Sequence, residues 1–159
     1  MMSKLTVRSE PIGTVMIIGS WNFPFGLALQ PLVSAIAAGC TAIVKPSEVS
    51  INTCRLLKEL IPRYLDKTAY PVIYADGQET AAILKQHKFD LVFYTGSSHV
   101  GRLVYQAAAA HLTPVVLELG GKNPVWLDKS FDLNVAAKRI LWARTVNSRG
   151  IRNIFFLFS

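Results

Sequence analysis

The sequence contains only two cysteines, and this scarcity excludes several kinds of site. Cys40 and Cys54 do not form a CxxC pair, so the spacing predicts neither a zinc site nor a disulfide framework. Charged residues are also few, at 17% of the chain against 51% hydrophobic residues. This composition is typical of an α/β protein whose parallel sheet is covered on both faces.

Long hydrophobic runs are missing as well. Lys, Arg, Asp or Pro interrupts each apolar stretch before it reaches the length of a membrane span. The first eight residues lack the apolar core of a signal peptide. We therefore expect no membrane span in this chain and a reducing, cytoplasmic location.

The net charge of +7 raises the question of a nucleic-acid partner. No helix-turn-helix, zinc-finger or RNP pattern accompanies the charge. The basic residues are mostly scattered, with one local cluster at Lys138, Arg139, Arg144, Arg149 and Arg152. A charge excess without a motif usually marks a solvated face, so we expect no nucleic-acid partner.

Short β-rich runs alternate with helical stretches along the chain, which predicts an α/β fold with a parallel sheet and crossover helices. Gly39 should close the first helix, and Pro62 should stop the second. The expected strands are Gly13–Ser20, Thr41–Val44, Tyr70–Tyr74, Leu91–Tyr94, Val115–Leu119 and Pro124–Leu127. The expected helices are Leu27–Ala38, Ser50–Leu60, Gln78–Gln86, one reaching His111, and Leu133–Val146.

A lone carboxylate, Glu118, lies inside the apolar run between Leu117 and Leu119, and Gly120-Gly121 follow it. Apolar neighbours would raise the pKa of such a group, as a general base requires, and the two glycines would let a ligand approach the backbone. The alternative is an ordinary strand end with a solvated Glu.

Two turns that follow expected strands could bind a nucleotide. Thr95-Gly96-Ser97 opens a helix whose N-terminus could hold a phosphate, although neither GxGxxG nor a P-loop is present. A plain strand-to-helix connection is the alternative. Lys45 and Glu48 could hold a ribose at the end of another strand, while Ser47 or Ser50 would cap the next helix.

A third turn surrounds Asn22 with the aromatic residues Trp21, Phe23 and Phe25. An amide held by rigid rings can donate a hydrogen bond to a developing oxyanion. The alternative is a buried aromatic hinge in which Asn22 only shapes the turn. No GxSxG motif is present, so a serine hydrolase has no support.

Together these motifs resemble the NAD(P)-dependent aldehyde dehydrogenases. WNFPF, KPSE, FYTGSSHVG and LELGGKNP occur in the family's order and at its spacing, over roughly residues 9 to 148. HLTP before LELGGK, together with YLDK, looks most like the class 3 branch, which acts on fatty and aromatic aldehydes. The resemblance implies a Rossmann-like cofactor-binding domain, NAD or NADP as cofactor, an aldehyde substrate oxidised to a carboxylic acid, and a homodimeric parent enzyme.

The resemblance also assigns roles to individual residues. Asn22 matches the oxyanion-stabilising Asn, and Glu118 matches the general base. Lys45 and Glu48 match the residues that hydrogen-bond the adenosine ribose. The remaining implied cofactor-binding positions are Thr95, Gly96, Ser97, Val100, Gly101 and Gly120.

The sequence departs from the family pattern near its end. The family continues Asn-Ser-Gly-Gln-x-Cys, with Cys as nucleophile, whereas here Arg149-Gly150-Ile151-Arg152 follows Asn147-Ser148, and Arg152 stands at the Cys position. A guanidinium is no nucleophile, so this chain should be inactive by itself. We expect a cofactor-binding domain over 1–119, the start of a catalytic domain over 120–148, and a non-family tail over 149–159.

The dimerisation elements of the parent enzyme should be largely absent from this chain. The alternatives to an inactive part of an enzyme are a non-catalytic dinucleotide-binding or regulatory fragment, or a truncated product without function.

Overall fold

The computed structural model describes residues 6–149 and 154–156. The chain forms two compact units, Met1–Glu118 and Leu119–Ser159, and each is described by itself. In the part of the chain that is described, no helix is long and apolar enough to span a bilayer. The same residues contain no group of three His, Cys, Asp or Glu side chains that could hold a metal ion.

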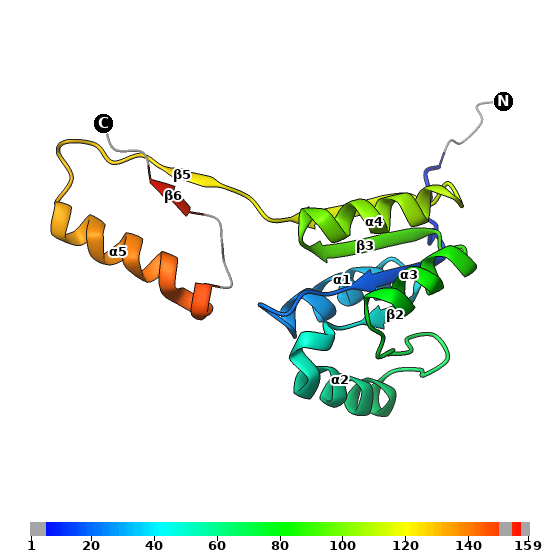
Figure 1. Ribbon diagram of the computed structural model, residues 1–159. Helices are drawn as coiled ribbons and strands as arrows, with labels where there is room; N and C mark the ends of the chain where they lie inside the picture. The colour runs from blue at the N-terminus through cyan, green and yellow to red at the C-terminus, as the bar shows by residue number, and fades with distance from the viewer. Residues whose placement is uncertain (1–5, 150–153, 157–159) are drawn as a thin grey trace. The chain divides into compact units, whose positions relative to one another are not determined.

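The first unit is built on a four-stranded sheet (Figure 1). Its strands are β1 (Thr14–Ile18), β2 (Thr41–Lys45), β3 (Leu91–Gly96) and β4 (Val115–Leu119), in the order β2-β1-β3-β4. β1 pairs in parallel with both β2 and β3, which confirms the predicted parallel α/β sheet. β2, the next strand in the chain, pairs with one edge of β1, and β3 pairs with the other edge. The direction of strand addition therefore reverses between β1 and β3, which makes this point a topological switch point.

Helices cover both faces of this sheet, and β1 accordingly is apolar and buried from Val15 to Ile18. Val15 and Ile17 pack on α1 (Gly26–Ala37) and α2 (Ile51–Tyr64), while Met16 and Ile18 pack on α3 (Gly77–Gln86) and α4 (Ser98–Ala109). Buried members of the first cluster include Leu32, Val44 and Leu57, and those of the second include Leu84, Val92 and Val104. The hydrophobic composition thus fills two cores around one sheet.

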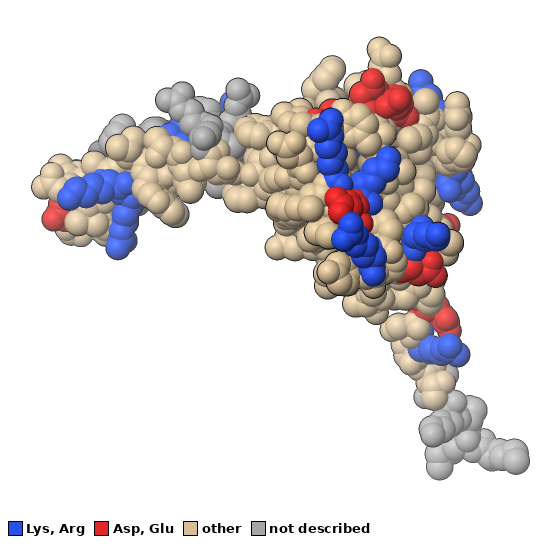
Figure 2. All heavy atoms as spheres, turned by 90° about the horizontal axis from the view of Figure 1, so that it is seen from below, with Lys and Arg blue, Asp and Glu red and all other residues tan. Residues whose placement is uncertain are grey.

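Lys and Arg side chains are interspersed with Asp and Glu on the face of the larger unit that Figure 2 shows. On α2, for example, Arg63 forms an ion pair with Glu59 one turn away. The visible face is therefore of mixed charge rather than a continuous basic surface.

Two local expectations about helix ends have different outcomes. Gly39 adopts a φ of 78° just after α1, and its N–H and that of Cys40 donate to Ile36 and Ala35, as a helix-closing glycine should. Pro62, however, does not stop α2, which runs on to Tyr64. The missing N–H of Pro62 removes one hydrogen bond, but Leu65 N again donates to Ile61 O at 2.9 Å, so the helical pattern resumes.

The strand expected over Tyr70–Tyr74 is wrong. This segment makes only an isolated bridge, between Val72 and Val44, beside the outer edge of β2. The O atoms of Ala69 and Pro71 accept from Ala42 N and Val44 N, but the ladder does not extend. Pro71 has no N–H to donate, which is a known reason for a strand to fail at an edge.

The second unit has little regular structure. β5 (Asn123–Val125) pairs in parallel with β6 (Ile154–Phe156), and α5 (Leu133–Thr145) continues into a 3-10 turn over Val146–Arg149. α5 begins at Asp132, whose side chain accepts from Asn134 N at 2.7 Å. β5 is shorter than the predicted Pro124–Leu127, and part of the predicted tail forms β6.

Candidate cofactor-binding site

Three of the predicted turns meet at one edge of the sheet. Asn22, Lys45 and Thr95 lie at or just beyond the carboxyl ends of β1, β2 and β3, which are neighbours in the sheet. Ile18 of β1 is in register with Lys45 on one side and with Tyr94 on the other. Since ligands of open α/β sheets bind beyond the strand ends at a switch point, this edge is the candidate site.

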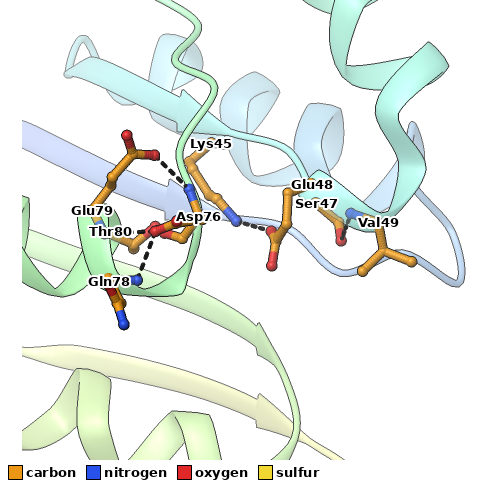
Figure 3. A network of polar contacts seen from close by, with 8 residues as sticks. All are labelled: Lys45, Ser47, Glu48, Val49, Asp76, Gln78, Glu79 and Thr80. Carbon is orange, nitrogen blue, oxygen red and sulfur yellow. Dashed lines mark hydrogen bonds and ion pairs between the residues drawn. The ribbon is translucent and has the colours of Figure 1, made fainter.

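Lys45 and Glu48 form the ion pair of the site (Figure 3). Lys45 is buried, with 4% of its surface exposed, and its Nζ donates to Glu48 Oε2. Burial opposes the ionisation of Glu48, but the hydrogen bond from Lys45 and its positive charge outweigh this, so the pKa of Glu48 lies below its ordinary value. The Glu48 side chain is 37% exposed and can therefore accept a further hydrogen bond from a ligand.

The sequence suggested that Ser47 or Ser50 caps the helix that follows Lys45, and in the structure only Ser47 acts as a cap. Ser47 Oγ accepts from Val49 N at 3.3 Å and caps the 3-10 turn Glu48–Ser50. Ser50 makes no cap of α2 and instead donates from Oγ to Trp21 O at 3.1 Å. This bond ties the loop of Lys45 to the loop of Asn22, so capping and site formation coexist.

A second carboxylate, Asp76, borders the ion pair (Figure 3). Its side chain accepts from Gln78 N and Glu79 N, both at 2.8 Å, and Glu79 Oε2 accepts from Asp76 N, which makes a complete capping box at the start of α3. The negative charge of Asp76 acts to raise the pKa of Glu48, in the direction opposite to Lys45.

The turn between β3 and α4 contains an unsatisfied hydroxyl. Among the described residues, Thr95 Oγ1 is buried without a hydrogen-bond partner, which is rare and points to a group supplied from outside the chain. A Cβ on the next residue, Gly96, would lie 2.3 Å from the hydroxyl oxygen of Tyr94, so no side chain fits there. Ser97 then caps α4, with Oγ accepting from Val100 N at 3.3 Å.

These residues fit a dinucleotide. The buried hydroxyl of Thr95 needs a polar partner, and the N-terminus of α4 presents N–H groups to an anion. Glu48 offers a carboxylate to ribose hydroxyls. Val100 and Gly101 lie in the first turns of α4, with Gly101 N donating to Ser97 O at 2.9 Å.

The surroundings of Asn22 differ from both alternatives in the sequence analysis. Trp21, Phe23 and Phe25 are each about half exposed, at 48%, 46% and 45%, so the rings around Asn22 are not buried as either alternative would suggest. Ser20 Oγ instead donates to Asn22 Oδ1 at 2.9 Å and orients the amide. The Nδ2 group is therefore the donor end of this amide.

Glu118 lies in β4 as predicted, but the expectation that apolar neighbours bury it is wrong. β4 is an edge strand, and its Val115 and Leu117 pack on the second core. The intervening Val116 and Glu118 point to the opposite face, where both are exposed.

The residues left from the predicted set are Gly120 and Arg152. Gly120 belongs to the second unit, and a Cβ there would meet no atom within 4 Å. Arg152, at the predicted nucleophile position, lies outside the described residues. Both cysteines of the chain are buried and free, and burial raises the pKa of the Cys54 thiol, which disfavours the reactive thiolate.

Comparison with known proteins assigns the chain to a family. The family profile described as "Aldehyde dehydrogenase family" matches residues 2–150. The chain belongs to the aldehyde dehydrogenase family. The family predicted from the four motifs is thereby confirmed.

Its relatives include several family 3 aldehyde dehydrogenases, which confirms the predicted branch. The chain is 54% identical over 147 residues to aldehyde dehydrogenase family 3 member A2 of Rattus norvegicus, covering 92% of this chain and 30% of the relative. It is 55% identical over 144 residues to the "dimeric NADP-preferring" aldehyde dehydrogenase of Mus musculus, covering 91% of this chain and 32% of the relative. The chain thus spans about a third of the length of these relatives.

Solved aldehyde dehydrogenases share the fold. The substrate-bound AldH of Staphylococcus aureus superposes with a TM-score of 0.84 at 43% identity, over 92% of this chain and 33% of that one. A variant of aldehyde dehydrogenase C from Pseudomonas syringae, in complex with NAD+ and octanal, gives a TM-score of 0.82 at 34% identity, over 88% of this chain and 29% of that one.

Two residues near this candidate site are not among those predicted from the sequence. Asp76 was detectable, because Asp76-Gly77-Gln78-Glu79 is a capping-box pattern directly before a predicted helix. Tyr94 is predicted only as a strand residue, because no pattern along the sequence shows that its hydroxyl donates to Ser97 O, three residues further on.

Proposed function

We propose that this chain binds NAD or NADP at the carboxyl edge of β1, β2 and β3, as the cofactor-binding part of an aldehyde dehydrogenase. The unsatisfied buried hydroxyl of Thr95, close to the start of α4, is the observation that carries the proposal. In this arrangement α4 faces the pyrophosphate. Glu48, held by Lys45, accepts hydrogen bonds from the adenosine ribose.

The proposed reaction of the whole enzyme is oxidation of a fatty or aromatic aldehyde to a carboxylic acid. Relatives named as an NADP-preferring enzyme and as a complex with NAD+ and octanal support the cofactor and the substrate class. The nicotinamide supplies a hydride acceptor when bound. Asn22 donates from Nδ2 to the aldehyde oxygen, Glu118 takes a proton from water, and Gly120 lets the ring approach.

The relative named "dimeric" also supports a homodimeric parent enzyme. We place the protein in the cytoplasm on the composition of the chain. The cofactor-binding domain of the proposal is 1–119, followed by the start of a catalytic domain to 148 and a tail over 149–159.

Cofactor titration tests the binding site. The chain should bind NAD+, and Glu48→Ala should weaken binding roughly tenfold or more, because a hydrogen bond to a charged group contributes about 1.5–3 kcal/mol. Glu59→Ala is the matched control, since Glu59 is exposed on α2 and pairs only with Arg63 among the contacts described. Equal affinity in the Glu48 and Glu59 variants would remove Glu48 from the site.

An activity assay tests whether the chain catalyses the reaction by itself. Arg152 at the nucleophile position predicts that the purified chain forms no NADH from NAD+ and octanal or benzaldehyde above the buffer rate, since losing a nucleophile costs several orders of magnitude. Binding without turnover fits this proposal. Sustained NADH formation by the chain would show that the nucleophile lies elsewhere.

A further inference from the structure

Tyr94 is a buried phenol at the edge of the proposed cofactor site. It is 4% exposed and belongs to the second core, between Val92 and the start of α4. Its ring packs among apolar side chains, but its hydroxyl reaches the turn and donates to Ser97 O at 3.2 Å. A buried hydroxyl requires such a partner, so this bond fixes the ring relative to the turn.

The acceptor of this bond is the residue from which α4 begins. Ser97 O also accepts from Gly101 N at 2.9 Å, and Ser97 Oγ accepts from Val100 N at 3.3 Å. Tyr94 therefore holds the same peptide group that makes the first hydrogen bond of the helix. Movement of that group would redirect the N–H groups of the first helical turn.

The phenol also fills the space beneath Gly96. A Cβ at position 96 would lie 2.3 Å from the Tyr94 hydroxyl oxygen and 2.7 Å from Cζ. The phenol thus occupies the space that a side chain at position 96 would need, and the two residues are packed against each other.

The hydroxyl stays a donor at neutral pH. Burial raises the pKa of Tyr94, and the negative charge of Glu48 acts in the same direction. Tyr94 thus contacts the turn through its bond to Ser97 O and is close enough to Glu48 to be affected by its charge.

We propose that Tyr94 is a positioning residue for the dinucleotide, whose hydroxyl holds the Thr95–Ser97 turn and the first turn of α4 in the geometry that accepts the pyrophosphate. The identity of the ligand rests on the proposed function, whereas the fixing of the turn rests on the hydrogen bond and the packing alone. The two parts can be tested separately.

The first test compares ligands with and without phosphate on the full chain. Tyr94→Phe keeps the ring and removes the hydroxyl, so affinity for NAD+ and ADP-ribose should fall roughly two- to tenfold, the range expected for one neutral hydrogen bond. Affinity for adenosine should not change. Tyr105→Phe is the control, because Tyr105 lies on α4 and is 57% exposed, and Glu48→Ala should weaken all three ligands.

The second test needs no ligand. Amide hydrogen exchange at Val100 and Gly101 should accelerate roughly two- to tenfold in Tyr94→Phe and stay unchanged in Tyr105→Phe, because these amides donate to Ser97. Unchanged exchange at both amides would overturn the inference, as would equal losses for adenosine and ADP-ribose. If the unmodified chain binds none of the ligands, the proposed function fails. Faster exchange of the Val100 and Gly101 amides in Tyr94→Phe would still support the inference that Tyr94 fixes the turn.

Discussion

The two units of the chain differ sharply in how they dispose of their apolar side chains. In the first, Met16 and Ile17 of β1 are fully buried, and Leu32, Leu84 and Val92 are no more than 2% exposed. In the second, α5 buries only Ala136, and the residues left exposed include Trp126 at 71%, Leu133 at 70% and Trp142 at 68%.

Local signals do not account for this difference. α3 in the first unit and α5 in the second both begin at an Asp that accepts from the next backbone N–H groups. Capping starts a helix, but most of a helix's stability in a protein comes from packing an apolar face. A two-stranded sheet such as β5 and β6 is marginal without a further layer. The comparison therefore places most of the stability of the chain in the first unit.

A matched pair of leucine substitutions tests this comparison with the largest expected effect. Leu32→Ala removes a side chain that is 2% exposed in the first core and should lower the free energy of unfolding by about 2–5 kcal/mol. Leu133→Ala makes the same change at a side chain that is 70% exposed and should alter it by less than about 0.5 kcal/mol. Urea denaturation of both variants measures the difference, and similar losses would show that α5 is packed in solution.

An intermediate effect is expected from the ion pair of the first unit. The pKa of Glu48 is lowered in the folded state. The ionised carboxylate therefore adds to the free energy of unfolding above the unfolded-state pKa of about 4.3, and this contribution is lost as pH falls through the folded-state pKa. Glu48→Gln keeps a hydrogen-bond acceptor for Lys45 and should destabilise the chain by about 1 kcal/mol or less at pH 7, given the partial exposure. Denaturation at pH 7 and at pH 3 should show this difference shrinking. A constant difference would mean that the charge of Glu48 is not what stabilises the fold.

The smallest effect on the first unit should come from removing the second. A chain ending at Leu119 retains β4 and both cores, and its thermal transition should lie within a few degrees of that of the full chain. A chain ending at Asn153 is the control that removes β6 but keeps α5. Circular dichroism during heating would measure both, and loss of the transition in the shorter chain would show that residues 120–159 support the sheet.

The sequence by itself determined the parallel α/β fold and the family. β1 is apolar from Val15 to Ile18, as a strand covered on both faces should be, and this run is visible in the sequence. The turns at Asn22, Lys45 and Thr95 were also recognisable, because parallel strands bring their carboxyl ends to one edge and turn chemistry is local.

Tertiary structure alone decided which of these residues are buried and which groups they contact. Leu117 and Leu119 flank Glu118 in sequence, but adjacent strand residues point to opposite faces, so Glu118 points away from the core that Leu117 packs on and is exposed. The residues around Pro71 favour a strand, but a strand forms only where its backbone can complete a ladder of hydrogen bonds with a partner. Pro71 has no N–H to donate, so only an isolated bridge forms there. The hold of Tyr94 on Ser97 and the orphaned hydroxyl of Thr95 depend on how β3 meets α4 in space, and no periodicity along the chain records that distance.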